Sequence, residues 1–355
     1  MPFHPLTVAR LDRSADDAVA ITLAVPPALR GVFRHVPGQH LTVRHAGLRR
    51  TYSLCSPAGP ERGEVTIGVR LIPGGAFSTH AVTALAAGDR LDVMPPRGRF
   101  TLRPAPGHYA AVAGGSGITP VLSMAASLLA ARTDARFTLL RSDRTAGSAM
   151  FLDEVADLKD RHPGRFQLAH ALTREERQAG PASGRLDAAR LRDLLAALVP
   201  PDAVTGWYLC GPPGLIDASR SALRALGVPP ERVRSELFLT TPDPPATLEN
   251  ERSFSDSPPH PAPHTTTLTA LLDGRGTTCA ATPGEPLLSA LLRARPDAPY
   301  ACRGGVCGTC RARLTEGRVH LARNDALEDD ELAAGYVLAC QAQPLTDHVA
   351  LDFDA

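Results

Sequence analysis

The sequence predicts a multidomain protein with an antiparallel β domain, an α/β domain built on a parallel sheet, and a small C-terminal module. The chain has 355 residues, more than one ordinary domain core accommodates. Residues 241–264 are rich in proline and poor in apolar periodicity, which is typical of an extended linker. The spacing of apolar runs also changes near residue 104. We therefore expect domains at 1–103, 104–240 and 265–355.

The first domain is predicted to consist of antiparallel strands. Its short apolar runs are interrupted by proline and glycine, as expected for strands of a barrel or a sandwich. The expected strands are LTVARL, AVAITLAV, QHLTVRH, EVTIGVRLI and DRLDVMPP.

The second domain is predicted to alternate strands with helices. Each of its apolar runs is followed by a segment with helical periodicity, and repeated βα units imply a parallel sheet with helices on its faces. The expected strands are HYAAVAGG, RFTLLRS, FQLAHALT and GWYLCG.

Composition argues against nucleic-acid and membrane partners. The formal net charge is +1, so the chain lacks the overall basic field that nucleic-acid binding uses. The first residues lack the apolar core of a signal peptide. The uncharged run Tyr109–Ala131 is long enough for a membrane helix, but GGSGITP interrupts it. We interpret it as a strand, a glycine turn and a helix, and expect a cytoplasmic protein.

Four of the seven cysteines lie in the last 54 residues, at Cys302, Cys307, Cys310 and Cys340. An odd number of cysteines in a long chain argues against a disulfide framework. The spacing C-x4-C-x2-C, with the fourth cysteine far downstream, matches four-thiolate [2Fe–2S] centres of the plant type. Structural zinc, the alternative, usually needs two short C-x2–4-C hooks, and Cys340 stands alone. We therefore expect an iron–sulfur cluster.

Two glycine turns follow predicted parallel strands. GGSGITP, residues 114–120, opens a helix and can present backbone N–H groups to a phosphate. The alternative is a turn that only tightens strand–helix packing. CGPP, residues 210–213, is a second such turn, and both would face one crevice, where ligands of open α/β sheets bind.

Together with RRTYSLCS at 49–56, these turns resemble the ferredoxin–NADP reductase family in order and spacing over residues 1–240. The C-terminal module resembles the plant-type ferredoxin domain, a β-grasp fold, with the four cysteines in the ligand positions. The resemblance implies an NAD(P)H-dependent flavoprotein oxidoreductase. It would hold FAD in a β-barrel, the nucleotide in the α/β domain and the [2Fe–2S] cluster in the last domain.

The resemblance also implies the flavin site. Arg50 would meet the flavin phosphates, Tyr52 would stack on the isoalloxazine, and Ser53 would be catalytic, close to flavin N5. VRLIPGGAFS is similar to the family's second flavin segment, and Glu236 resembles a residue near the flavin. The implied FAD-binding residues are Arg50, Thr51, Tyr52, Ser53, Val69, Arg70, Gly75, Phe77, Ser78, Thr119 and Phe238.

For the nucleotide, the resemblance implies a second catalytic residue, Cys210, near nicotinamide C4. A buried thiol at a strand end is the alternative. Arg144 and Arg141 could bind the 2′-phosphate of NADPH, whereas Asp143 could accept from the free ribose hydroxyl of NADH. We favour NADPH. The implied NADP-binding residues are Gly115, Ser116, Gly117, Ile118, Thr119, Pro120, Arg144, Cys210, Gly211 and Pro212.

Electrons would pass from NADPH through FAD and the cluster to a separate oxygenase, since no residues resemble a metal site for activating oxygen. The whole chain is most similar to reductases of the phenylacetyl-CoA epoxidase type, on LDVMPPRGRF, PYACRGGVCGTCRARLTEGRVH and NDALEDDELAAGYVLACQAQP. The implied partner is a multi-subunit di-iron epoxidase. The FMN-dependent phthalate dioxygenase type, the ketosteroid 9α-hydroxylase type and a stand-alone diaphorase remain alternatives.

An acidic run, Glu328–Glu331, precedes Cys340. Two interpretations are open: a solvated helix face, or a docking patch for a basic partner surface.

Overall fold

The computed structural model describes residues 3–46, 48–59, 63–175, 184–238, 265–300, 303–305, 308–324, 326–327 and 329–355. The chain divides into two compact units. One holds the antiparallel and parallel sheets of the first 240 residues, and the other holds the C-terminal sheets. The predicted linker, 241–264, lies outside the described residues.

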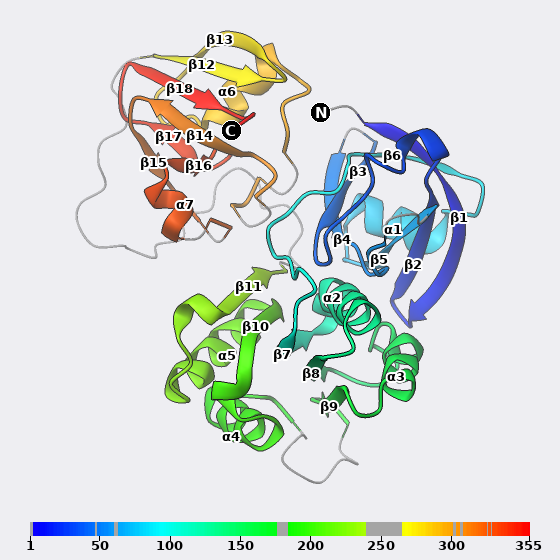
Figure 1. Ribbon diagram of the computed structural model, residues 1–355. Coiled ribbons are helices and arrows are strands. Elements are labelled where there is room, and N and C mark those ends of the chain that lie inside the picture. Colours follow the sequence, from blue (N-terminus) through cyan, green and yellow to red (C-terminus); the bar gives the residue numbers. More distant parts are fainter. Residues whose placement is uncertain are drawn as a thin grey trace. The chain divides into compact units, whose positions relative to one another are not determined.

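The first domain contains a six-stranded sheet in the order β4-β3-β6-β1-β2-β5 (Figure 1). Its elements are β1 (His4–Ala15), β2 (Ala18–Ala24), β3 (His40–His45), β4 (Leu48–Ser53), β5 (Glu64–Arg70), α1 (Ala76–Thr83) and β6 (Arg90–Val93). An isolated bridge between Leu54 and Ile67 joins the end of β4 to β5, so the two edges of the sheet meet. Closure of this kind removes free strand edges, and it confirms the predicted antiparallel barrel.

The barrel encloses an apolar core because alternate residues of each strand point inward. Leu6, Ile21, Leu41 and Ile67 are fully buried in it. Helix α1, which the apolar runs did not predict, adds Phe77 to the same core.

The second domain is built on a five-stranded parallel sheet in the order β11-β10-β7-β8-β9. Its strands are β7 (Gly107–Gly114), β8 (Ala135–Asp143), β9 (Phe166–Leu172), β10 (Val204–Gly211) and β11 (Val233–Leu237). Its helices are α2 (Ile118–Ala131), α3 (Leu152–Arg161), α4 (Ala188–Leu198) and α5 (Pro213–Ala225). All the predicted strands and helices form, and β11 extends the sheet beyond them.

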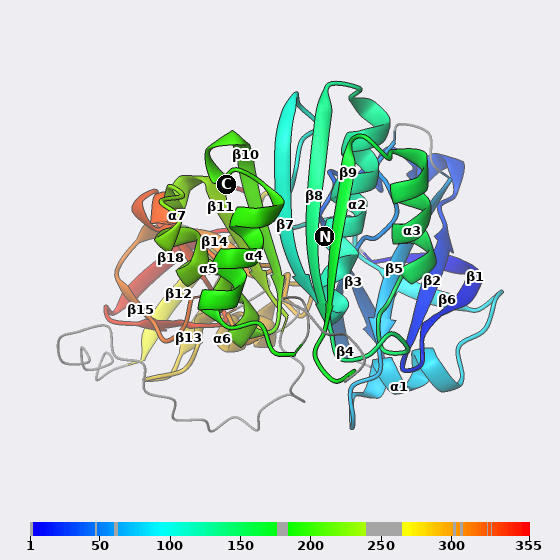
Figure 2. The same ribbon diagram turned by 90° about the horizontal axis from the view of Figure 1, so that it is seen from below.

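Helices cover both faces of this sheet (Figure 2). Residues of α2 and α3 pack in one apolar core with Tyr208 and Cys210, and residues of α4 and α5 pack in the other with Trp207. The chain moves from β7 outward to β8 and β9, then returns to the other side of β7 with β10. The carboxyl ends of β7 and β10 therefore flank the reversal in strand order where open α/β sheets bind ligands.

The C-terminal unit contains a mixed sheet in the order β13-β12-β18-β14-β16, packed against α6, and a two-stranded pair, β15-β17. Its elements are β12 (Thr266–Leu272), β13 (Arg275–Ala281), α6 (Leu287–Ala294), β14 (Arg311–Glu316), β15 (Val319–Leu321), α7 (Asp329–Ala333), β16 (Tyr336–Leu338), β17 (Ala342–Pro344) and β18 (His348–Asp352). Parallel pairing of the first and last strands, β12 and β18, beside antiparallel neighbours agrees with the expected β-grasp fold.

The described part of the chain contains no helix with both the length and the apolar character needed to cross a bilayer. The uncharged run Tyr109–Ala131 forms β7, a glycine turn and α2, as predicted.

Candidate active site

The GGSGITP turn passes unusually close to the end of β10. A Cβ atom at Gly117 would lie 2.2 Å from the carbonyl oxygen of Cys210, and Gly115 has φ +57°. Only glycine allows this approach without displacing backbone. Helix α2 begins within this motif, at Ile118, whose N–H donates to the carbonyls of Gly115 and Ser116, and Gly117 places this helix N-terminus beside the end of β10. This geometry is compatible with a phosphate-binding turn, and phosphate binding here stays a prediction.

Gly211 brings the second turn equally close to the first. It has φ +153°, and a Cβ there would lie 3.0 Å from the backbone nitrogen of Gly114. Pro212 then caps the N-terminus of α5. Two helix N-termini therefore flank the crevice between β7 and β10, which fits a dinucleotide pyrophosphate.

Three polar side chains meet at this crevice from different strands. Ser53, at the end of β4, is buried and donates to Glu236 Oε2 at 3.4 Å. Glu236 pairs with Cys210 in the register of β11 and β10. The structure thus brings together Ser53 and Cys210, which lie 157 residues apart in the sequence.

Cys210 is fully buried. Burial raises the pKa of its thiol well above the ordinary value, and the neighbouring Glu236 raises it further. The thiol is therefore neutral and does not act as a thiolate nucleophile. Cys210 is thus a buried thiol at a strand end, as the alternative expected, while its place near nicotinamide C4 stays a prediction.

Thr119 contacts the barrel at Gly68, a residue that was not predicted to belong to the site. Its hydroxyl donates to the carbonyl of Ser116 at 2.9 Å, and a Cβ at Gly68 would lie 2.7 Å from its methyl carbon. Gly68 lies in the middle of β5, where a glycine weakens a strand unless another group approaches closely. The isolated glycine in EVTIGVRLI was the signal for this contact.

Other predicted flavin residues pack in the barrel core or shape the turn before α1. Tyr52 packs its ring 5.3 Å from that of Phe77, and Phe77 and Val69 have side chains buried in the barrel core. Ser78 accepts from Ile72 N–H at 3.1 Å and donates to the carbonyl of Gly75 at 3.2 Å. Its hydroxyl therefore shapes the turn that begins α1.

Arg50, Thr51 and Phe238 complete the predicted flavin residues. Arg50 and Thr51 lie on β4, where Arg50 Nη1 donates to the carbonyl of Arg49 at 2.8 Å. Phe238 follows β11, donates its N–H to the carbonyl of Gly211 at 3.1 Å, and packs against the core under α2.

Arg70 points toward the nucleotide turn. Its Nη1 would lie 2.9 Å from a Cβ at Gly115, its Nε donates to Asp17 Oδ1 at 3.1 Å, and its Nη2 donates to the carbonyl of Ser148. Burial lowers the pKa of its guanidinium, and Asp17 opposes that effect. An arginine predicted to bind the flavin thus lies beside the GGSGITP turn, which is predicted to bind the nucleotide.

Arg141 and Asp143 differ from expectation. Arg141 is 1% exposed; its Nε donates to Asp143 Oδ2 at 2.5 Å and its Nη2 to the carbonyl of Met150 at 2.6 Å. Asp143 is also buried and accepts from His170 at 2.9 Å. Neither side chain is presented to a ligand. Arg144 is half exposed and pairs with Asp17 at 3.3 Å.

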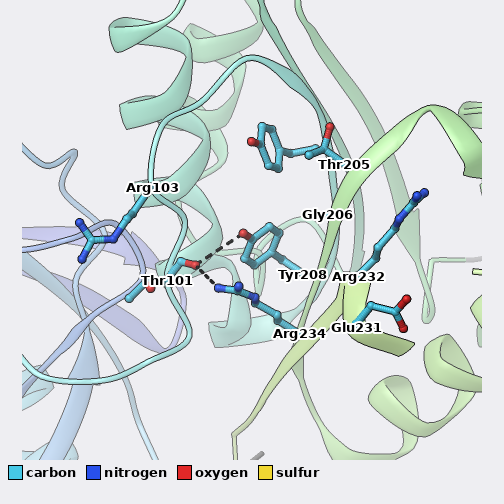
Figure 3. Close-up of a pocket in the computed structure, with 9 residues that line it drawn as sticks. Thr101, Arg103, Thr205, Gly206, Tyr208, Glu231, Arg232 and Arg234 are labelled. Carbon is cyan, nitrogen blue, oxygen red and sulfur yellow. Dashed lines mark hydrogen bonds between the residues drawn. The ribbon is translucent and has the colours of Figure 1, made fainter. Parts of the chain in front are cut away.

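A cavity of about 350 Å³ lies toward the other end of β7 and β10. It is lined by Thr101, Arg103, Tyr109, Thr205, Gly206, Tyr208, Glu231, Arg232 and Arg234. Tyr208 and Arg234 both point toward the carbonyl of Thr101 and donate to it, at 3.5 and 3.2 Å (Figure 3). These bonds fix the segment between barrel and sheet, and none of the predicted flavin or nucleotide residues lines the cavity.

The thiolate centre is partly described. Cys310 and Cys340 are buried, whereas Cys302 and Cys307 lie outside the described residues. Gln341 Nε2 donates to Cys340 Sγ at 3.7 Å and to the carbonyl of Arg303 at 2.8 Å. A hydrogen bond to sulfur is one of the features that tune a cluster's potential. The described part of this centre therefore fits thiolate ligation of a [2Fe–2S] cluster.

The acidic run is not a uniform surface. Glu331 is 3% exposed and accepts from Arg311 Nε at 2.7 Å, so it is neither solvated nor available to a partner. Asp330 is exposed, and Glu328 lies outside the described residues. Glu331 therefore belongs neither to a solvated helix face nor to a docking patch, because it is buried in an ion pair with Arg311.

Glu236 is expected to make stability depend on pH. Burial raises the pKa of its carboxyl to about 8 from 4.5, against the opposing hydrogen bond from Ser53. The folded protein thus binds this proton more tightly than the unfolded chain does. The resulting stabilisation of the folded state is fully present below pH 4.5 and is lost as the pH rises through 8. From about pH 5 to 9, the free energy of unfolding of the wild type should fall by about 4 kcal/mol relative to that of Glu236→Gln.

Urea denaturation at a series of pH values measures this difference. The matched control is Glu231→Gln, which changes an exposed glutamate near the start of β11 and should follow the wild-type profile. Parallel profiles for wild type and Glu236→Gln would contradict the assignment of a raised pKa.

Three protein families match successive parts of the chain. Residues 7–102 match the family described as oxidoreductase FAD-binding domain, residues 111–221 the oxidoreductase NAD-binding domain, and residues 270–345 the 2Fe-2S iron-sulfur cluster binding domain.

Whole-length relatives are also found. One subunit of the 1,2-phenylacetyl-CoA epoxidase of Escherichia coli (strain K12) is 40% identical, over 99% of this chain and 98% of that protein. The ferredoxin reductase component of the 3-ketosteroid-9-alpha-monooxygenase of Rhodococcus rhodochrous is 32% identical, over 98% and 96%. The solved structure of phthalate dioxygenase reductase aligns with a TM-score of 0.56 at 25% identity, over 99% of this chain and 98% of that one.

Proposed function

The chain belongs to the ferredoxin–NADP reductase type of flavoprotein oxidoreductases with a C-terminal [2Fe–2S] domain, and we propose that it supplies electrons from NADPH to a multi-subunit di-iron epoxidase acting on phenylacetyl-CoA. Its relatives include reductase components of separate oxygenases. The observation that carries the finer proposal is the 40% identity to one component of such an epoxidase over all three domains. We also propose a cytoplasmic setting, because the cysteine pattern matches a four-thiolate centre and not a disulfide framework.

We assign the flavin to the barrel side of the crevice. Tyr52 would offer a ring face, Arg50 and Thr51 would bind from β4, and the turn at Gly75 with the N-terminus of α1 would meet phosphate. When bound, FAD accepts two electrons from a nucleotide and releases them one at a time to a cluster. FAD rather than FMN follows from the family match of residues 7–102.

We assign the nucleotide to the sheet side. The turn Gly115–Pro120 and the turn Cys210–Pro212 would hold its pyrophosphate and nicotinamide ribose. Cys210 would act as a neutral, close-packed wall at the nicotinamide. With its raised pKa, Glu236 carries a proton at neutral pH, and the Ser53 hydroxyl donates to its Oε2 at the crevice. Arg144 favours NADPH over NADH because it can meet a 2′-phosphate.

The partner is tested by mixing the purified holoprotein with a reconstituted phenylacetyl-CoA epoxidase and following NADPH oxidation. We expect oxidation that depends on phenylacetyl-CoA, with epoxide formed in proportion. Reduction of flavin and cluster without transfer to the epoxidase would reject this partner and direct the search to Rieske-type oxygenases. Fast turnover with a small acceptor and no protein partner would instead indicate a diaphorase.

A further inference from the structure

The hairpin between β1 and β2 places one carboxylate between two arginines. Asp17 Oδ1 accepts from Arg70 Nε at 3.1 Å, and Asp17 Oδ2 pairs with Arg144 Nη2 at 3.3 Å. Arg70 and Asp17 are 14% and 30% exposed, whereas Arg144 is 51% exposed. A residue of the barrel thus holds the arginine that the proposed function assigns to the ribose end of the nucleotide.

The backbone holds this hairpin against the sheet domain without help from the Asp17 side chain. Asp16 N–H donates to the carbonyl of Gly147 at 2.9 Å, and Phe151 N–H donates to the carbonyl of Ser14 at 3.3 Å. A Cβ at Gly147 would lie 2.4 Å from Asp16 Oδ2, so the two loops are in close contact. Removal of the Asp17 charge therefore leaves the docking of the hairpin in place.

The two bonds of Asp17 affect the two nucleotides differently. Arg70 lies beside the glycine turn, where NADH and NADPH carry the same pyrophosphate. Arg144 lies past the end of β8, where the two differ by one phosphate. That phosphate carries close to two negative charges, so it would have to displace Asp17 from Arg144 and would meet the repulsion of its carboxylate. The 2′-hydroxyl of NADH carries no charge, so it neither has to displace Asp17 nor is repelled by its carboxylate.

We propose that Asp17 is a specificity-determining residue that moderates the preference for NADPH by competing with the 2′-phosphate for Arg144. This inference rests on the proposed role of Arg144. Specificity here is a difference between two affinities, and Asp17 supplies the repulsive part of it. A residue of the barrel, the domain proposed to bind the flavin, thereby reduces the preference for NADPH.

The test is kcat/KM for NADPH and NADH with ferricyanide as acceptor, so that no oxygenase is needed. Asp17→Asn should raise the NADPH/NADH ratio about fivefold at low salt, which is the scale of one partly exposed ion pair. Inhibition by 2′,5′-ADP should strengthen by a similar factor, while inhibition by 5′-ADP stays unchanged. Asp16→Asn, which changes the neighbouring exposed carboxylate, should leave the ratio at the wild-type value.

Arg144→Met separates the inference from the function on which it rests. We expect it to lower the NADPH/NADH ratio, and Asp17→Asn to have no effect on the ratio in that background. Equal changes for both nucleotides in Asp17→Asn, with Arg144→Met still lowering the ratio, would overturn the role of Asp17 alone. An unchanged ratio in Arg144→Met would overturn both assignments.

Discussion

Asp143→Ala is expected to lower the free energy of unfolding by about 3–5 kcal/mol, because it leaves the buried guanidinium of Arg141 without its counter-charge. Burial by itself raises the pKa of Asp143, but hydrogen bonds from His170 and Arg141 outweigh it and lower the pKa below the ordinary value. Among the described residues, one buried nitrogen of Arg141, Nη1, already has no hydrogen-bond partner. Loss of Asp143 would leave Nε in the same state.

The measurement is urea denaturation followed by the fluorescence of Trp207. This is the only tryptophan of the sequence, and it is buried in β10 of the same domain. The matched control is Asp134→Ala, which removes the carboxylate of the exposed pair Arg132–Asp134 and should not shift the midpoint measurably.

A second variant identifies the cause. Arg141→Met combined with Asp143→Ala should recover much of the lost stability, since no charge is then buried without a partner. If the double variant is as unstable as Asp143→Ala alone, packing rather than charge explains the loss.

Cys340→Ser is expected to abolish the cluster and with it the delivery of electrons to an oxygenase. The iron content should fall from about two per chain to none, and the visible absorbance of the centre should disappear. Ferricyanide reduction by NADPH should remain within about twofold of wild type, because the flavin and nucleotide residues belong to the other domains.

Cys279→Ser is the matched control. Cys279 belongs to the same unit but is half-buried on β13, outside the predicted ligand set, and should keep its iron. Cys340→Ser protein that still holds two irons would remove Cys340 from the ligand set. Zinc in the wild-type protein would replace the cluster assignment altogether.

Local sequence was sufficient for the elements and for the two turns. Period-2 and period-3.6 patterns are set by neighbours in the chain, so the predicted strands and helices form. The glycine turns could also be predicted, since positive φ angles and close backbone approach leave a signature in residue type alone. The spacing of the cysteines indicated the cluster without any knowledge of the fold.

Tertiary contacts control which polar side chains are available. Arg141 and Arg144 have the same chemistry three residues apart, yet Arg141 is buried against Asp143 and Met150 while Arg144 is half exposed. Glu331 continues an acidic run in the sequence but is buried with Arg311.

Residue order alone was therefore enough to predict the order of the domains, their strands and helices, the glycine turns and the type of metal centre. Three contacts are visible only in the folded chain. Ser53 and Cys210 both lie next to Glu236. Thr119 packs against Gly68, and Asp17 pairs with Arg144. The difference arises because backbone conformation responds to neighbours along the chain. The partner and the burial of a charged side chain depend instead on segments that only the fold brings together.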